Sequence, residues 1–138
     1  MTDKSARFND LRWADAKLHG LTVRPGENTR TGDVVCDISF PERWEPLGPW
    51  VSARVIFTNC LVVRAELDFV TMSLTGNNIA DAACLTDSQL RTELLSPYEP
   101  QWLAANVEAD RAIILHYLIE LTVGGRIDVL ATGFRVDG

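Results

Sequence analysis

Apolar and polar residues alternate almost without interruption over residues 50–70, WVSARVIFTNCLVVRAELDFV. The apolar side chains occupy odd-numbered positions, namely Val51, Ala53, Val55, Phe57, Leu61, Val63, Ala65, Leu67 and Phe69. A period of two is typical of strands that bury one face. The run is too long for one ordinary strand, and an odd-length loop would preserve its parity. We therefore predict a hairpin turning at Thr58-Asn59, with Asn59 in the left-handed region.

A second hairpin is predicted over residues 116–136, HYLIELTVGGRIDVLATGFRV. A two-residue loop would oppose Val123 and Arg126, which places an apolar residue against a charged one. A three-residue loop, Val123-Gly124-Gly125, pairs Leu121 with Ile127 and puts Gly125 in the left-handed position. The Gly-Gly is thus interpreted as a structural turn and not as a phosphate-binding loop, which needs a helix behind it.

After Ala131 the apolar residues change from odd-numbered to even-numbered positions, which predicts a bulge near Gly133. The final strands are accordingly predicted at residues 115–123 and 126–136. Further strands are predicted in WADAKLHGLTV, with a slip near Gly20, in DVVCDISF and in NNIADAACL. TDSQLRTELLSP has the pattern of a short helix capped by Thr86 or Asp87. A second helical segment is predicted over residues 100–110.

These elements predict a mainly β (α+β) protein with an antiparallel arrangement of six or seven strands and one or two short helices. A single curved sheet, a sandwich and an open barrel are all compatible with the pattern. The length of 138 residues suits a single β-rich domain, residues 1–138. Unpaired edge strands of such a sheet would also permit a homo-oligomer.

Composition narrows the classes of partner. The formal net charge of −6 argues against nucleic acid, which requires a clustered basic surface, and is compatible with a basic protein partner. No apolar run approaches the roughly 20 residues of a membrane helix, so we expect no membrane association. The start of the sequence lacks the apolar core of a signal peptide, and we expect a cytoplasmic protein.

Residues that could carry catalysis are few. His19 and His116 are interpreted as surface or structural histidines, His116 on the polar face of the last hairpin. The three cysteines include no CxxC pair and are expected to be reduced. Carboxylates such as Glu66 and Asp68 share one strand face, whereas glycosidases need two facing each other. We predict no enzyme activity, no cofactor and no metal.

The loop PERWEPLGPW, residues 41–50, contains three prolines and two tryptophans and cannot be a central strand. Trp44 and Trp50 lie there beside Glu42 and Glu45. One interpretation is that the tryptophans pack under the loop and close one end of the sheet. The other is a rigid aromatic and acidic contact surface, because tryptophan commonly contributes interface energy. These four residues are the candidate partner-binding site.

Trp13-Ala14-Asp15-Ala16-Lys17-Leu18 precedes the first predicted strand, and Phe57-Thr58-Asn59-Cys60 forms a predicted turn. With the final glycine-containing hairpin, these motifs span most of the chain. They resemble small bacterial β proteins, some of which are immunity proteins of polymorphic toxin systems. That group has a Trp-His-Asp opening, and here Ala14 replaces the histidine. The resemblance implies a cytoplasmic, antitoxin-like binder of a toxin domain without catalysis, and it identifies no toxin-contacting residue.

Two functions follow as hypotheses. The leading one is a non-catalytic protein-binding module of the immunity-protein kind. The alternative is a small-ligand-binding or catalytic β-barrel with an aromatic-lined pocket and one histidine. A solid core with an exposed acidic and aromatic surface would favour the first, and a deep cavity containing His19 or His116 the second.

Overall fold

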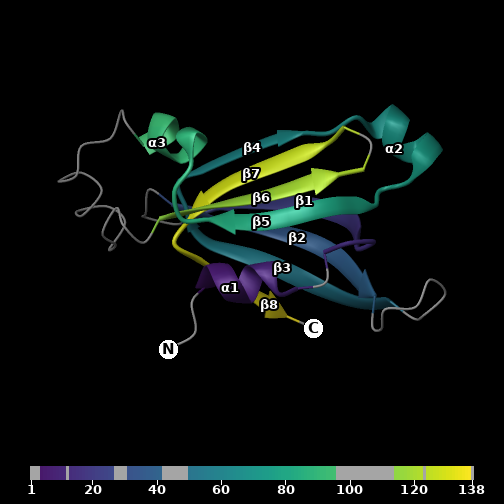
Figure 1. Ribbon diagram of the computed structural model, residues 1–138, viewed down its shortest axis with the longest axis horizontal. Helices are drawn as coiled ribbons and strands as arrows, with labels where there is room; N and C mark the ends of the chain where they lie inside the picture. Colours follow the sequence, from purple (N-terminus) through teal and green to yellow (C-terminus); the bar gives the residue numbers. More distant parts are fainter. Residues whose placement is uncertain are drawn as a thin grey trace.

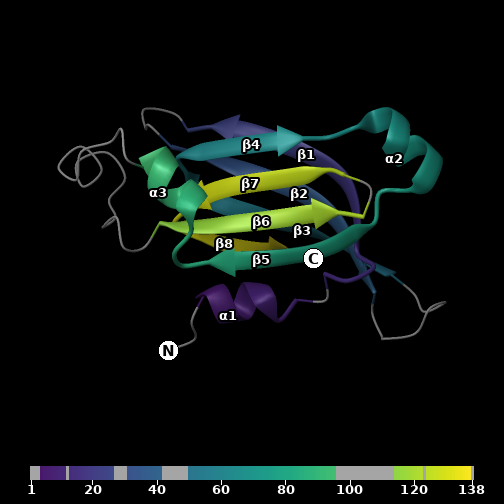
Figure 2. The ribbon, with the colours of Figure 1, turned by 45° about the horizontal axis from the view of Figure 1, so that its top comes forward.

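The computed structural model describes residues 4–11, 13–26, 31–41, 50–95, 114–122 and 124–137. These residues form eight strands in two antiparallel four-stranded sheets that lie face to face (Figures 1 and 2). Sheet A has the order β1 (Lys17–Pro25), β2 (Gly32–Pro41), β3 (Trp50–Cys60), β8 (Gly133–Asp137). Sheet B has the order β4 (Val62–Glu66), β7 (Arg126–Ala131), β6 (Leu115–Leu121), β5 (Ile79–Leu85). The predicted antiparallel β class is confirmed, as a pair of open sheets with eight strands instead of six or seven.

Two strands pass from one sheet to the other. β3 becomes β4 after Leu61 alone, and β7 becomes β8 after Thr132. The Leu61 N–H donates to the Leu130 carbonyl at 2.8 Å, and the Thr132 N–H to that of Thr58 at 3.2 Å. The hairpin predicted at Thr58-Asn59 is therefore wrong: Asn59 is left-handed, with φ of 51°, but it lies at a bend between sheets. The alternation of apolar and polar residues cannot distinguish a bend in the chain from a hairpin, because both can keep the apolar side chains at odd-numbered positions.

The hairpin between β6 and β7 has the predicted three-residue loop, placed one residue earlier. The Leu121 N–H donates to the Gly125 carbonyl at 2.9 Å, and Ile119 pairs with Ile127. Gly124, not Gly125, is the left-handed residue, with φ of 82°. Gly125 is buried, and a Cβ there would lie 2.6 Å from Cδ1 of Leu121. The second glycine is therefore needed because Leu121 packs closely against it. The predicted register did not show this contact.

Helix α1 (Lys4–Asn9), which the sequence pattern did not predict, packs along β5 at one side of the sandwich. The side chain of Asn9 accepts a hydrogen bond from the backbone N–H of Cys84 at 2.8 Å, so the helix satisfies part of this sheet edge. The ring of Phe8 is fully buried, with its centroid 4.7–6.0 Å from those of Trp13, Phe57, Tyr117 and Phe134. Aromatic side chains thus fill the space between the sheets.

Two more short helices lie at opposite ends of sheet B (Figure 2). α2 (Phe69–Thr75) follows β4 and is capped by Asp68, whose Oδ1 accepts the Thr71 N–H at 3.0 Å. It replaces the end of the predicted second strand. α3 (Gln89–Leu95) confirms the predicted helix there, whereas the predicted helical segment at 100–110 lies outside the described residues. Among the described helices, none has the length and hydropathy to cross a bilayer.

Candidate functional site

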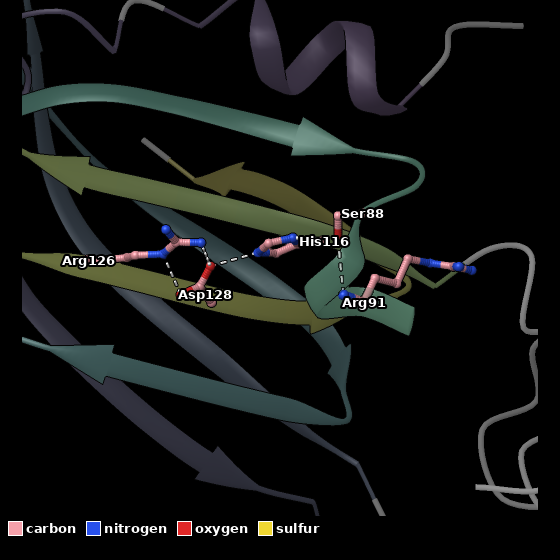
Figure 3. Close-up of polar contacts among 5 residues, drawn as sticks. All are labelled: Ser88, Arg91, His116, Arg126 and Asp128. Atoms are coloured by element: carbon pink, nitrogen blue, oxygen red, sulfur yellow. Dashed lines mark hydrogen bonds and ion pairs between the residues drawn. The ribbon is translucent and has the colours of Figure 1, made fainter. Parts of the chain in front are cut away.

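Three polar side chains on the outer face of sheet B and one at the start of α3 form a connected group (Figure 3). Nε2 of His116 lies 2.7 Å from Oδ1 of Asp128, and Nδ1 lies 2.9 Å from Oγ of Ser88. Arg126 donates to both carboxylate oxygens, at 2.8 Å from Nε and 3.0 Å from Nη2. His116 is only 1% exposed. We call Ser88, His116, Arg126 and Asp128 the α3 anchor.

The register of the last hairpin brings the anchor together. Tyr117 faces the core, so His116 points outward, and Asp128 lies opposite Leu118 on the neighbouring strand. His116 and Asp128 are therefore diagonal neighbours on one face. The predicted polar face of His116 is correct, but the predicted register was two residues off and hid this pair. The sequence feature that could have indicated this pair is that both residues have even numbers, in a hairpin whose odd-numbered residues are apolar.

Ser88 connects the sheet to the helix. Its Oγ accepts the Arg91 N–H at 3.0 Å and its carbonyl accepts the Thr92 N–H at 3.1 Å, so Ser88 is the N-cap of α3. The predicted caps, Thr86 and Asp87, are thus wrong by one or two residues. Arg91 also donates from Nε to the carbonyl of Ile114, just before β6, at 2.6 Å. These bonds hold the first turn of α3 against one end of sheet B.

Asp128 carries the negative charge of the anchor. Burial alone would raise the pKa of its carboxyl, but hydrogen bonds from Arg126 and His116 outweigh burial and keep that pKa below its ordinary value. The bond to Asp128 likewise raises the pKa of Arg126. When the imidazole is neutral and donates from Nε2 to the carboxylate, Nδ1 accepts the hydroxyl proton of Ser88. Every group of the anchor then has a partner.

The chain of bonds from Ser88 through His116 to Asp128 has the composition of a hydrolase triad. In such triads Nε2 faces the serine and Nδ1–H faces the carboxylate, whereas here the ring is turned over. The Ser88 hydroxyl also accepts a backbone N–H as a helix cap. Arg126 already balances the carboxylate charge that would stabilise an imidazolium. The geometry fits a structural link better than a nucleophile.

Other reactive groups are dispersed. Cys36, Cys60 and Cys84 are free and buried, and burial raises the pKa of Cys36 and of Cys60 to about 12. In the part of the chain that the structure describes, no group of three or more His, Cys, Asp or Glu side chains is placed to hold a metal ion. His19 lies on the outer face of sheet A, with Nε2 2.7 Å from Oγ of Ser39.

A row of charged side chains crosses all four strands of sheet B at the hairpin end. Asp81 pairs in register with Glu120, Glu120 with Arg126, and Arg126 with Glu66. Arg126 makes its ion pair with Asp128, and none of the three other carboxylates has a salt bridge to a described residue. All three are exposed. We call Asp81, Glu120 and Glu66 the acidic row.

Beyond the acidic row, the first turn of α2 presents two large apolar side chains to solvent. Phe69 is 74% exposed and Val70 is 70% exposed, the highest values among the large hydrophobic residues described. Both residues follow Glu66 closely in the chain, and α2, which they begin, lies beyond the same end of the sheet (Figure 1). We call Phe69 and Val70 the apolar knob.

Two hollows accompany these polar groups. One, of about 290 Å³, lies on sheet B between Leu90 of α3 and the side chains of Arg64, Glu66, Arg126 and Asp128. The other, of about 650 Å³, lies on the outer face of sheet A beside His19, Asp37, Arg54 and Asp137.

The predicted partner-binding residues are only partly described. Trp50 is at the start of β3 and 39% exposed. Its Nε1 donates to the Asp15 carbonyl at 3.4 Å, and Nζ of Lys17 lies 4.7 Å from the ring centroid. Trp44, Glu42 and Glu45 lie outside the described residues. The acidic row and the apolar knob were not predicted as a site, although the sequence showed Glu66 and Asp68 on a solvated face.

Comparison with known proteins identifies no relative. No family model matches the chain, and no curated protein and no solved structure matches it significantly.

Proposed function

We propose that this protein is a non-catalytic protein-binding module whose contact surface consists of the apolar knob and the acidic row. The observation that carries the proposal is the exposure of Phe69 and Val70 at the same end of sheet B as three exposed carboxylates that form no salt bridge with a described residue. Removing an exposed Phe or Val side chain from water contributes about 1.5–3 kcal/mol. Charged neighbours then select the partner and accelerate encounter.

The interior supports this proposal over a ligand-binding barrel. The sheets are open, and the space between them is occupied by Phe8, Trp13, Phe57 and Tyr117. Neither histidine faces such a space, because His116 is in the α3 anchor and His19 is on the outer face of sheet A. An aromatic-lined pocket inside a closed barrel is therefore not the arrangement of this fold.

The charge of the surface indicates a basic partner. The chain has a formal net charge of −6, and the acidic row contributes three exposed carboxylates around the single cation Arg126. The sequence resemblance to immunity proteins suggests a toxin domain as this partner, in the cytoplasm. Glu42, Trp44, Glu45 and Trp50 would supply a second contact region. A toxin gene adjacent to the gene for this chain would support the partner class, and binding to an acidic partner would contradict it.

Substitution of the apolar knob tests the proposal. Wild-type protein is immobilised beside the variant F69S/V70S and a control, V23S/V136S, which removes two exposed valines from sheet A. We expect a protein bound by the wild type and control to be retained at least tenfold less by F69S/V70S, since truncated hot spots cost about 2 kcal/mol or more. Melting temperatures must agree among the three. Equal retention by all three proteins would contradict the proposal.

A second candidate, small-ligand binding, has the hollow of about 650 Å³ on sheet A in its favour. His19, Arg54 and Asp137 provide convergent polar groups there. The ion pair between Arg54 and Asp37 is exposed, with 3.3 Å between Nε and Oδ1, so a ligand could displace it at little cost. Amide chemical-shift changes confined to these residues in a fragment screen would favour this candidate over the first.

A further inference from the structure

We propose that two copies of this chain pair through the free edge of β4 and join their sheets B into one continuous sheet. β4 is the last strand of its sheet, and among the described strands only β7 pairs with it (Figure 2). The opposite edge is covered, because α1 packs along β5 and the side chain of Asn9 accepts the N–H of Cys84. An unpaired edge is a template for another strand, and a second copy provides an identical one. This partner is distinct from that of the proposed function.

β4 lacks the features that hinder strand addition elsewhere in the sandwich. β1 has a bulge between Leu18 and Gly20 and ends at Pro25, and both bulges and prolines protect sheet edges. On β8, Arg135 already has an ion pair with Asp137 of the same strand, at 3.4 Å. β4 pairs with β7 without any shift in register. It is therefore the regular edge that the described part of the fold leaves open.

The backbone groups on this edge have the phase that antiparallel pairing requires. Directly opposed residues of an antiparallel ladder exchange both backbone hydrogen bonds at every second position. The Leu121 N–H donates to the Gly125 carbonyl, so odd-numbered residues of β7 bond to β6 and even-numbered ones face β4. Even-numbered residues of β4 lie opposite even-numbered residues of β7. Val63 and Ala65 therefore direct their N–H and C=O groups away from the sheet.

One register of two β4 strands pairs opposite charges. When Ala65 lies opposite Ala65 of the second copy, Arg64 lies opposite Glu66 and Val63 lies opposite Leu67, each pair occurring twice. Neither Arg64 nor Glu66 makes a salt bridge with a described residue, so both are available for such pairs. Registers centred on Arg64 or on Glu66 instead place identical charges directly opposite each other, which is destabilising.

The same register matches the two faces of the sheet. Opposed residues of paired strands share a face. The two ion pairs therefore lie on the outer face, since Arg64 and Glu66 are opposite Asp128 and Arg126 there. The apolar pairs lie on the inner face, where Val63 and Leu67 pack against the core. The two cores thus meet on one side of the joined sheet.

The ladder ends where α2 begins. The chain is still extended at Asp68, with φ of −103° and ψ of 97°, so pairing can include residues 62–68. A contact of this length is at the small end of specific interfaces, and we expect a dimer that dissociates on dilution. Asp81 and Glu120 belong to β5 and β6 and lie outside the ladder. Dimerisation therefore leaves these two carboxylates of the acidic row on the outer face of each copy.

Sedimentation of charge variants over a range of concentrations tests the pairing. R64E places a carboxylate opposite Glu66 of the second copy, whereas the exchange R64E/E66R restores opposite charges. The control is R135E, the same change on the edge strand β8. We expect R64E to raise the dissociation constant at least tenfold, and R64E/E66R and R135E to dimerise like the wild type. Wild-type protein that is monomeric at about 1 mM, or a dimer lost in R135E and kept in R64E, would overturn the proposal.

A backbone variant tests the same contact without changing any charge. Ala65→Pro removes an N–H that faces the open edge, and a monomer tolerates proline at such a position of an edge strand. We expect the melting temperature at low concentration to stay close to that of the wild type, while dimerisation is lost. Amide signals of residues 62–68 should shift with concentration in the wild type and not in the variant. Dimerisation of Ala65→Pro with unchanged affinity would show that β4 is not the interface.

Discussion

Nε2 of His116 lies 2.7 Å from Oδ1 of Asp128 on the outer face of sheet B, where a strand residue is ordinarily solvated. The two side chains are only 2% and 11% exposed, because α3 covers them. The outer face is thereby divided into a part that the protein uses for its own helix and a part that stays free. Removing either partner leaves a buried polar group without compensation, which makes the pair testable.

Asp128→Ala should destabilise the fold by about 3 kcal/mol, because it leaves His116 and Arg126 without their shared acceptor. The control is Asp137→Ala, whose side chain is 53% exposed and lies 3.4 Å from Arg135. An exposed pair of this kind contributes about 0–1 kcal/mol. Urea denaturation measures both, and equal losses in the two variants would show that the anchor is not structural.

Acid should weaken the anchor. The folded pKa of Asp128 is below its unfolded value of about 3.9, so its ionisation stabilises the fold fully above that pH. This contribution is lost as the pH falls through the folded pKa. The difference in unfolding free energy between wild type and Asp128→Asn should therefore be constant from about pH 5 upward and shrink below about pH 4. A difference that grows in acid would contradict the assigned direction.

Ser88→Ala should cost about 0.5–2 kcal/mol, the usual range for loss of an N-cap. A fluorophosphonate that labels activated serines should leave Ser88 unmodified in the native protein, since its hydroxyl caps α3. Mass spectrometry after incubation checks this. Stoichiometric labelling of Ser88 that disappears in His116→Ala would indicate a nucleophile and contradict the structural assignment.

The two glycines of the last hairpin should respond differently to substitution. Gly125→Ala should destabilise by about 1–3 kcal/mol, because its Cβ would lie 2.6 Å from Leu121 and 3.4 Å from the Glu66 carbonyl. Gly124→Asn should be tolerated within about 1 kcal/mol, since Asn enters the left-handed region readily and, apart from the chain neighbours, no described residue has an atom within 4 Å of a Cβ there. Thermal melts of both variants measure these losses of stability. A larger loss for Gly124→Asn than for Gly125→Ala would support the register predicted from the sequence.

Alternation predicted most of the strands, because burial of one sheet face imposes a period of two. Val34, Cys36, Ile38, Val55 and Phe57 are buried as that pattern requires. The alternating pattern could not predict that the chain bends at Asn59 and does not reverse, since the apolar residues keep odd-numbered positions in either case. Helix α1 escaped prediction because six residues with one buried aromatic, Phe8, show no helical period.

The candidate site was harder to predict, because it depends on register and on helix placement. The register predicted for the last hairpin is shifted by two residues, and in it His116 and Asp128 are not diagonal neighbours. Phe69 was assigned to a buried strand face by parity, whereas Asp68 caps a helix there and turns the ring into solvent. Local capping chemistry thus overrode the hydrophobic pattern at the residue on which the proposed function depends.

Hydrogen exchange of the protein with and without its captured partner tests the proposed contact surface most directly. We predict slower exchange on binding in residues 62–71, 118–122 and 124–126, which include the apolar knob and the hairpin end of sheet B. Strands β1 and β2 of sheet A should exchange at unchanged rates and serve as the internal reference. Protection confined to sheet A, with residues 62–71 unaffected, would contradict the assignment of this surface.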